Sequence, residues 1–136
     1  MSSPPPPPHL GSGTNLRVIV CDDEWEAATE LAEYLSDQGY DVVAVDNGSL
    51  ALSLLNAAIG PVCLVSDIRM PGLSGLDLLH AAVQRSREWP TSVVLVTGHV
   101  DANESLARYP EAVATLMKPI DLAELDLVLL GILSHQ

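Results

Sequence analysis

The feature that most constrains the fold is a regular alternation, from Leu16 onward, between short apolar runs and longer amphipathic stretches. The apolar runs are rich in valine and leucine and end at turn-forming or acidic residues, which is typical of strands buried on both faces. The alternation predicts repeated strand–helix units, and therefore a parallel sheet covered by helices on both faces. The five predicted strands are Leu16–Cys21, Asp41–Val45, Val62–Ser66, Ser92–Thr97 and Val113–Met117.

The stretches between the strands carry two kinds of helix signal. Apolar residues recur at helical spacing from Ala27 to Leu35 and from Ala51 to Ala58, which predicts two amphipathic helices. Three further helix starts are indicated by a capping residue that precedes a carboxylate by three positions. These pairs are Ser74 with Asp77, Asp101 with Glu104, and Asp121 with Glu124; Pro110 must end the second of these helices early.

Length favours one domain, because 136 residues can bury one compact core and are too few for two. The folded domain is expected to span residues 15–136. Residues 1–14 are rich in Pro, Gly and Ser and are predicted to be a disordered leader or a cloning remnant.

Composition excludes several classes of protein. The apolar runs fall far short of the roughly 20 residues that a membrane span requires, and no secretory signal is visible, so we expect a cytoplasmic protein without membrane contact. A net charge of −12 argues against direct binding to nucleic acid, which needs clustered cations. Cys21 and Cys63 lie inside apolar runs and are expected to be buried hydrophobes rather than zinc ligands.

Polar residues close four of the five predicted strands. Asp22 and Asp23 follow the first strand, Asp67 the third, and Lys118 the fifth, while Thr97 ends the fourth. Because the carboxyl ends of parallel strands meet at the edge where open sheets bind ligands, these side chains are expected to converge. For the acidic pair alone, a helix start favoured by the helix dipole is the competing interpretation, and for Lys118 it is a solvated surface lysine.

Three converging carboxylates would need more positive charge than one lysine supplies. Two unit charges about 4 Å apart repel by about 4 kcal/mol at an effective dielectric constant of about 20. A divalent cation would restore the balance, and Mg²⁺ suits a site with few carboxylates that leaves positions for water and phosphate oxygens. We therefore expect Mg²⁺, or Mn²⁺, as a cofactor.

Four segments in this order resemble the receiver domains of bacterial response regulators, over roughly residues 16–134. Each is weak alone, but four in order on alternating strands form a specific signal. The resemblance implies a flavodoxin-like, doubly wound α/β fold with five parallel strands in the order 2-1-3-4-5, in a single domain. The segments are Cys21–Glu24 (CDDE), Ser66–Gly72 (SDIRMPG), Val96–His99 (VTGH) and Met117–Pro119 (MKP).

The resemblance also implies a role for each matching residue. Asp67 matches the phosphoacceptor, and Thr97 and Lys118 match the hydroxyl and the ammonium that contact the phosphoryl group. Asp22, Asp23, Asp67 and the backbone carbonyl of Arg69 match the metal ligands. Pro119 matches a proline that is often cis in the family, and the side chains of Arg69 and His99 match two variable positions that influence hydrolysis.

One residue departs from the family pattern. Three positions before the lysine, the family usually carries Tyr or Phe as a readout of phosphorylation, and this chain has Thr115. The chemistry can therefore be retained while its coupling to an output differs. The resemblance also implies a homodimer through the face formed by the predicted fourth helix, fifth strand and fifth helix. Pro110 interrupts the segment that builds this face, so its use as an output surface is expected to differ from the family pattern.

Function is expected to be that of a phosphoacceptor switch which receives a phosphoryl group from a histidine kinase or phosphotransfer protein. It would assist its own phosphorylation and dephosphorylation without being an enzyme in the usual sense.

A degenerate receiver that only binds protein is an alternative favoured by Thr115. A haloacid-dehalogenase-like phosphatase is a weaker one, because it expects a second Asp where Arg69 stands. A flavin-binding relative is weaker still, because Asp22–Glu24 would repel its phosphate.

Overall fold

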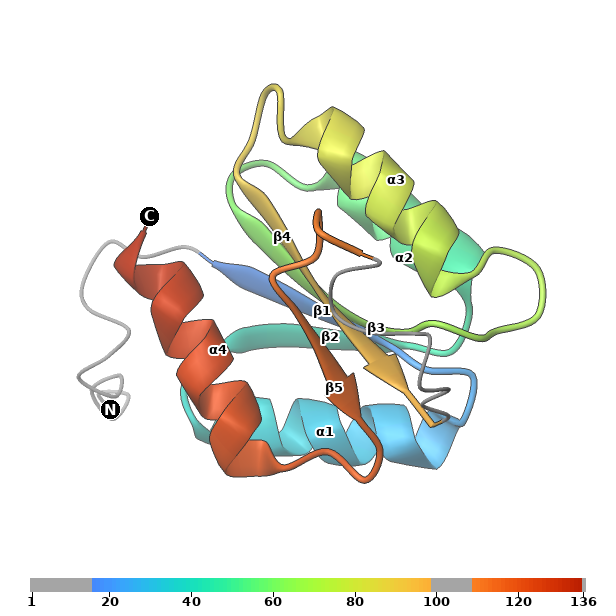
Figure 1. Cartoon of the computed structure of the whole chain (residues 1–136), viewed down its shortest axis with the longest axis vertical. Helices are drawn as coiled ribbons and strands as arrows, with labels where there is room; N and C mark the ends of the chain where they lie inside the picture. Colours follow the sequence, from blue (N-terminus) through green and yellow to red (C-terminus); the bar gives the residue numbers. More distant parts are fainter. Residues whose placement is uncertain (1–15, 99–108, 136) are drawn as a thin grey trace, which may run out of the picture.

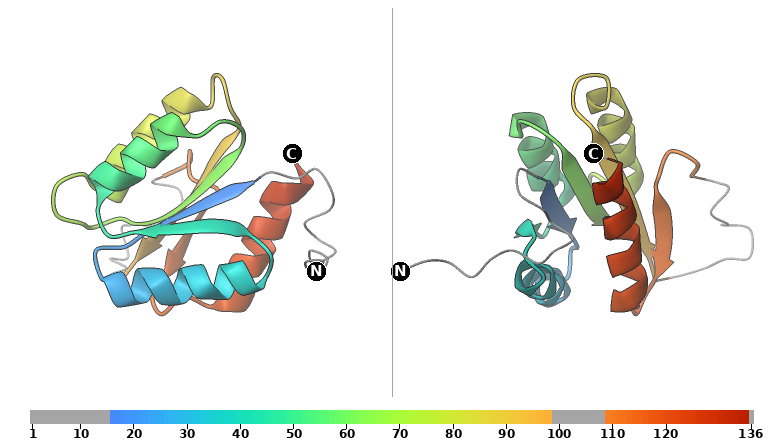
Figure 2. Two further views of the ribbon diagram at one scale, coloured as in Figure 1. Left: turned by 180° about the vertical axis from the view of Figure 1, so that it is seen from behind. Right: turned by 90° about the vertical axis from the view of Figure 1, so that its left-hand side faces the viewer.

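The computed structural model describes residues 16–98 and 109–135, which form one parallel sheet between two layers of helices (Figures 1 and 2). The strands are β1 (Arg17–Cys21), β2 (Asp41–Val45), β3 (Val62–Asp67), β4 (Thr91–Thr97) and β5 (Ala114–Met117). The helices are α1 (Trp25–Asp37), α2 (Gly48–Ala57), α3 (Gly75–Arg85) and α4 (Leu122–Ser134). The strand order is β2-β1-β3-β4-β5, which confirms the predicted topology.

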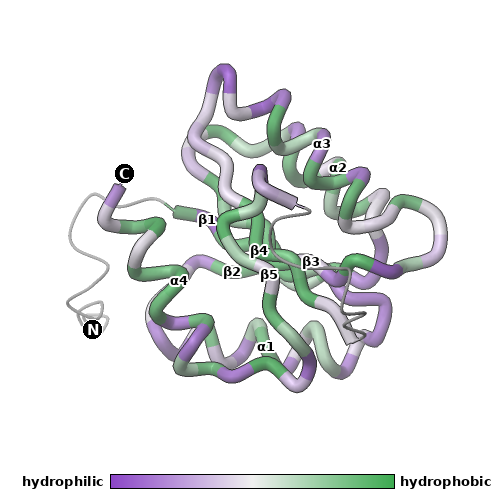
Figure 3. Tube along the Cα trace, viewed as in Figure 1, coloured by the Kyte–Doolittle hydropathy of each residue, from purple (hydrophilic) through white to green (hydrophobic). Residues whose placement is uncertain are grey.

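Alternate residues of each central strand enter two separate cores. Val18 and Val20 of β1 pack in the cluster on the face covered by α1 and α4, whereas Ile19 and Cys21 pack in the cluster under α2 and α3. All six residues of β3 are buried, as expected for a central strand with helices on both faces. In Figure 3 the central strands are mostly hydrophobic, whereas hydrophilic residues recur along the helices.

Helix starts agree with the capping signals where the structure describes them. Ser74 accepts a hydrogen bond from the Asp77 amide while the Asp77 carboxylate accepts one from the Ser74 amide, a complete capping box. Asp121 accepts hydrogen bonds from the amides of Ala123 and Glu124, and α4 begins immediately after it. Both predicted starts are therefore confirmed.

Differences from the predicted elements are small. The predicted strand bounds differ from the observed ones by one residue at four ends. Ala58, predicted to lie in a helix, is extended and ends α2, which corrects that bound. The helix predicted to start at Asp101 and the leader predicted for residues 1–14 lie outside the described residues. No helix in the described ranges is long and apolar enough to cross a bilayer.

Arg85, the last residue of α3, ties several segments together at the amino-terminal edge of the sheet. Its guanidinium donates to the carbonyl oxygens of Leu55, Ala58 and Gly60 at 2.9 Å each, and to the hydroxyl of Thr91 at 2.8 Å. One side chain thus joins the end of α2, the segment leading into β3, and the start of β4. These contacts lie at the opposite edge of the sheet from the residues considered next.

Candidate functional site

The carboxyl ends of the central strands carry the polar residues singled out in the sequence. Asp67 is the last residue of β3, and Asp22 follows β1, whose last residue Cys21 is in register with Ser66. Thr97 ends β4 in register with Met117, so Lys118 leaves the sheet beside it. Parallel pairing therefore delivers segments that are far apart in the chain to one edge.

Lys118 joins two of the acidic residues. Its ammonium nitrogen lies 3.0 Å from Oδ2 of Asp22 and 2.9 Å from Oδ2 of Asp67. Burial acts to lower the pKa of Lys118, but hydrogen bonds and charge interactions with Asp67 and Asp22 outweigh it, and the pKa is raised. Lys118 is therefore ion-paired within the site and is not a solvated surface residue.

Asp22, Asp23 and Asp67 form a compact acidic group. One carboxylate oxygen from each lies within 4.8 Å of the others, and within the described ranges this is the group of His, Cys, Asp or Glu residues that could hold a metal ion. Asp22 and Asp67 are each only 9% exposed, whereas Asp23 is exposed. Three carboxylates against one ammonium leave a net charge of about −2, which one divalent cation would balance. The oxygen ligands and the charge both suit Mg²⁺.

Burial shapes the ionisation of the central carboxylate. The pKa of Asp67 is raised because burial penalises its charged form and because Asp22 and Asp23 add negative charge, although Lys118 acts in the opposite direction. A cation bound by the three carboxylates would favour the ionised form. The three carboxylates therefore favour the binding of a further cation.

Local backbone contacts hold these carboxylates in place. Oδ1 of Asp22 accepts a hydrogen bond from the Glu24 amide at 2.9 Å, at the start of α1. The Ser66 hydroxyl donates to the carbonyl oxygen of Asp67 at 2.9 Å, and the Ile68 amide donates to Val96 O at 2.9 Å. The first contact fixes the Asp22 carboxylate, and the other two fix the backbone at Asp67 and Ile68.

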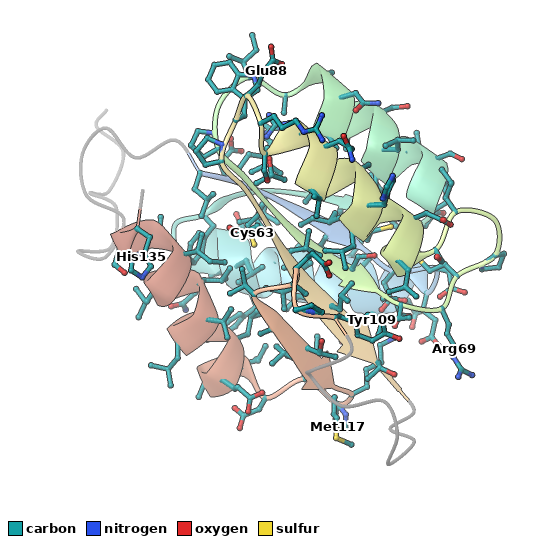
Figure 4. All side chains as sticks on the ribbon, turned by 45° about the horizontal axis from the view of Figure 1, so that its top comes forward. Cys63, Arg69, Glu88, Tyr109, Met117 and His135 are labelled. Carbon is teal, nitrogen blue, oxygen red and sulfur yellow. The ribbon has the colours of Figure 1, made fainter. Side chains whose placement is uncertain are left out.

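The remaining predicted residues lie near this centre, point away from it, or fall outside the described residues. Thr97 is buried at the end of β4, and Thr115 lies on β5, two residues before Met117. The Lys118–Pro119 bond is cis, as the resemblance predicted. The Arg69 side chain extends away from the body of the molecule (Figure 4), and His99 lies outside the described residues.

One neighbour of the site was not indicated by the sequence motifs. Gly75 is the first residue of α3, and its amide donates to Ile68 O at 2.9 Å, directly behind the end of β3. Glycine is a poor helix former, so its position just after the Ser74 cap is a signal for close backbone approach.

Both cysteines are buried, as predicted. Burial raises the pKa of Cys21 to about 11 and that of Cys63 to about 12. Figure 4 shows Cys63 in the interior of the molecule.

Comparisons with known proteins agree with this geometry. The family model of the response regulator receiver domain matches residues 18–129. The regulatory protein AtoC of Escherichia coli is 34% identical over 113 residues, which cover 82% of this chain and 24% of AtoC. The positive alginate biosynthesis regulatory protein of Pseudomonas aeruginosa is 38% identical over 115 residues, which cover 80% of this chain and 45% of that protein. The chain thus spans less than half the length of these curated relatives.

Solved structures show the same likeness. A CheY-like response regulator receiver domain protein from Methanospirillum hungatei superposes with a TM-score of 0.70 and 26% identity, covering 90% of this chain and 99% of that one. Its near-complete coverage matches the single folded unit described above. From the family match, the relatives and the fold, the chain belongs to the response regulator receiver domain family.

Proposed function

We propose that the protein is a signalling switch in which Asp67 accepts a phosphoryl group from the phosphohistidine of a histidine kinase or phosphotransfer protein, in a Mg²⁺-dependent reaction. The observation that carries this proposal is the bridge from Lys118 to both Asp22 and Asp67, at 3.0 and 2.9 Å. A buried carboxylate with a cation and two further carboxylates beside it suits phosphoryl transfer, which depends mainly on positioning and charge neutralisation.

The residues have complementary proposed roles. A carboxylate oxygen of Asp67 forms the new bond to phosphorus as the bond from phosphorus to the donor nitrogen breaks, and the imidazole leaves. Lys118 neutralises a phosphoryl oxygen, and the Thr97 hydroxyl donates a hydrogen bond to another. Asp22, Asp23, Asp67 and the carbonyl of Arg69 would hold Mg²⁺ or Mn²⁺, which supplies further neutralisation of the transferring oxygens.

The same groups would assist loss of the phosphoryl group to water, with the side chains of Arg69 and His99 influencing the rate. The protein is therefore proposed to promote its own phosphorylation and dephosphorylation. We infer a cytoplasmic location, a receiver unit at residues 15–136 and a leader at residues 1–14. The proposed partners are the phosphodonor protein and a second copy bound through the predicted fourth-helix, fifth-strand and fifth-helix face, without direct contact to nucleic acid.

Intact-mass spectrometry tests the proposal directly. The wild-type chain is incubated with Mg²⁺ and acetyl phosphate, beside Asp67→Asn and a control, Asp37→Asn, which changes an exposed carboxylate at the end of α1. One phosphoryl group is expected on the wild type and on the control, and none on Asp67→Asn or after chelation of Mg²⁺. Equal labelling of the wild type and Asp67→Asn would remove Asp67 from the proposed role.

Thr115 favours a second candidate, a receiver that binds its partner without phosphorylation. In that case the wild type would remain unlabelled under the same conditions while still folded. The mass measurement therefore separates the two functions.

A further inference from the structure

A cavity of about 590 Å³ adjoins the acidic centre on the face of the sheet covered by α1 and α4. The strand residues Val20, Val65 and Val96 line it but are only 1–3% exposed, so its accessible apolar surface comes from Leu31 and Ile120, which are half-buried. Asp67 also lines it. Phosphoryl transfer to Asp67 uses none of these apolar groups. A volume of several hundred Å³ with an apolar lining and a few polar groups is typical of sites for small organic molecules.

The space is not filled because one wall carries a small side chain. On α1 the cavity is bordered by Ala27, whose side chain is small, and by Leu31 one turn later; Ile120 borders it from the connection between β5 and α4. Tyr34, also in the wall, donates its hydroxyl to Oδ2 of Asp126 on α4 at 2.5 Å. This hydrogen bond links the two helices beside the cavity.

Charge defines what the cavity would accept. Glu24 and Glu30 line it and are exposed, so their carboxylates lie at its mouth, while Asp22 and Asp67 lie at its inner end. The ammonium of Lys118 is already shared between those two aspartates. The cavity therefore combines apolar walls, from Leu31 and Ile120, with a net negative charge that Lys118 does not balance.

We propose that this cavity binds a small organic cation, an aromatic or branched aliphatic amine, whose apolar body packs between Leu31 and Ile120 and whose ammonium faces Glu30. Such a ligand buries apolar surface and gains charge attraction at the mouth, whereas an anion of the same shape would be repelled. A bound amine lies beside Asp67 and slows phosphoryl uptake. Only this last consequence rests on the proposed function; binding itself does not.

The binding test uses 2-phenylethylamine, with 2-phenylethanol as the neutral match and phenylacetate as the anionic match. Each is titrated into protein saturated with Mg²⁺, so that an amine acting only as a substitute for the metal gives no signal. Chemical-shift changes in protein NMR are followed at Ala27, Leu31 and Ile120. The amine is expected to bind about tenfold more tightly than the alcohol, and the carboxylate is expected not to bind.

Variants on α1 locate the site. Ala27→Leu fills the cavity, Glu30→Gln removes one charge at its mouth, and Glu33→Gln is the matched control because Glu33 is exposed and does not line the cavity. Loss of amine binding in Ala27→Leu, about tenfold weakening in Glu30→Gln and no change in Glu33→Gln are expected. Dispersed NMR spectra verify that each variant is folded.

Unchanged binding to Ala27→Leu, equal affinity for the three probes, or no binding of the amine would overturn the proposal. The last result would leave the cavity to another occupant, such as a side chain of a partner protein. Failure of the proposed function is read separately, as absence of acetyl phosphate labelling in protein without any amine.

Discussion

Gly75 and Asp67 are packed backbone to backbone: a methyl group on Gly75 would lie 2.3 Å from the carbonyl oxygen of Asp67 and 2.9 Å from the α-carbon of Ile68. The first turn of α3 therefore supports the end of β3 from behind, with no room for a side chain. A side chain at Gly75 would therefore force apart the start of α3 and the end of β3, which carries the proposed phosphoacceptor.

Gly75→Ala is expected to lower the free energy of unfolding by about 2 kcal/mol or more, because overpacking against backbone forces the chain to shift. It should also slow acetyl phosphate uptake in the fraction that is folded. The matched control is Gly131→Ala, at an open position of α4, which should add about 0.5–1 kcal/mol. Urea unfolding measures both, and equal stability of the two variants would contradict the packing.

Asp23→Asn is expected to weaken Mg²⁺ binding about tenfold or more with little change in stability, because Asp23 is exposed and its charge serves the acidic group. The readout is fluorescence of Trp25, which lies two residues later, in protein with Trp89→Phe. Asp37→Asn should leave the titration unchanged. An unaltered titration for Asp23→Asn would exclude it as a ligand.

Lys118→Met is expected to lower stability by about 1–3 kcal/mol near pH 8, because Asp22 and Asp67 lose the cation between them. The pKa of Asp67 should rise further in this variant. A carboxyl group with a raised pKa in the folded state stabilises the fold at low pH, and this stabilisation is lost as the pH rises through that pKa. The difference in free energy of unfolding between Lys118→Met and the wild type should therefore shrink towards pH 4. Added Mg²⁺ should restore part of the stability, and a deficit independent of both pH and Mg²⁺ would contradict this electrostatic account.

Arg85→Met is expected to destabilise the fold by about 2–4 kcal/mol, since three carbonyl oxygens and the Thr91 hydroxyl lose their donor. Arg87→Met changes an exposed arginine two positions later and should change stability by less than about 0.5 kcal/mol. Urea unfolding measures the difference. Similar values for the two variants would show that the Arg85 contacts contribute nothing specific.

Cys21 and Cys63 should resist iodoacetamide at pH 8 in the folded protein and react in denaturant, since burial protects both thiols and raises their pKa to about 11 and about 12. Because the folded state keeps the thiols protonated, their contribution to stability is intact below pH 9 and falls as pH rises towards those values. Mass spectrometry counts the labels, and rapid modification of either native thiol would contradict its burial.

Much of this molecule could be predicted because its sequence signals are local and consistent. Valine-rich runs marked the strands, and Ser74 and Asp121 marked two helix starts that the structure confirms. The meeting of Asp22, Asp67 and Lys118 followed from parallel topology alone, since residues after parallel strands must share an edge.

Other features could not be predicted because they depend on distances between segments. The Arg85 contacts join carbonyl groups, which leave no trace in side-chain patterns. The cavity beside Ala27 depends on how closely α1 approaches α4, and the close approach of Gly75 depends on the path of the loop after β3. Apolar spacing predicts a helix that includes Ala58, but the backbone of Ala58 is extended because α2 ends there.

The Arg85 contacts and the acidic group occupy opposite edges of the same sheet, so the contacts that stabilise one edge are separate from the proposed phosphorylation site at the other. For protein engineering, the two edges can be altered separately. Directed evolution for heat tolerance can target the edge around Arg85 without changing any residue of the proposed site. Conversely, a library that alters the lifetime of the signal can be built on a scaffold reinforced beforehand at the far rim.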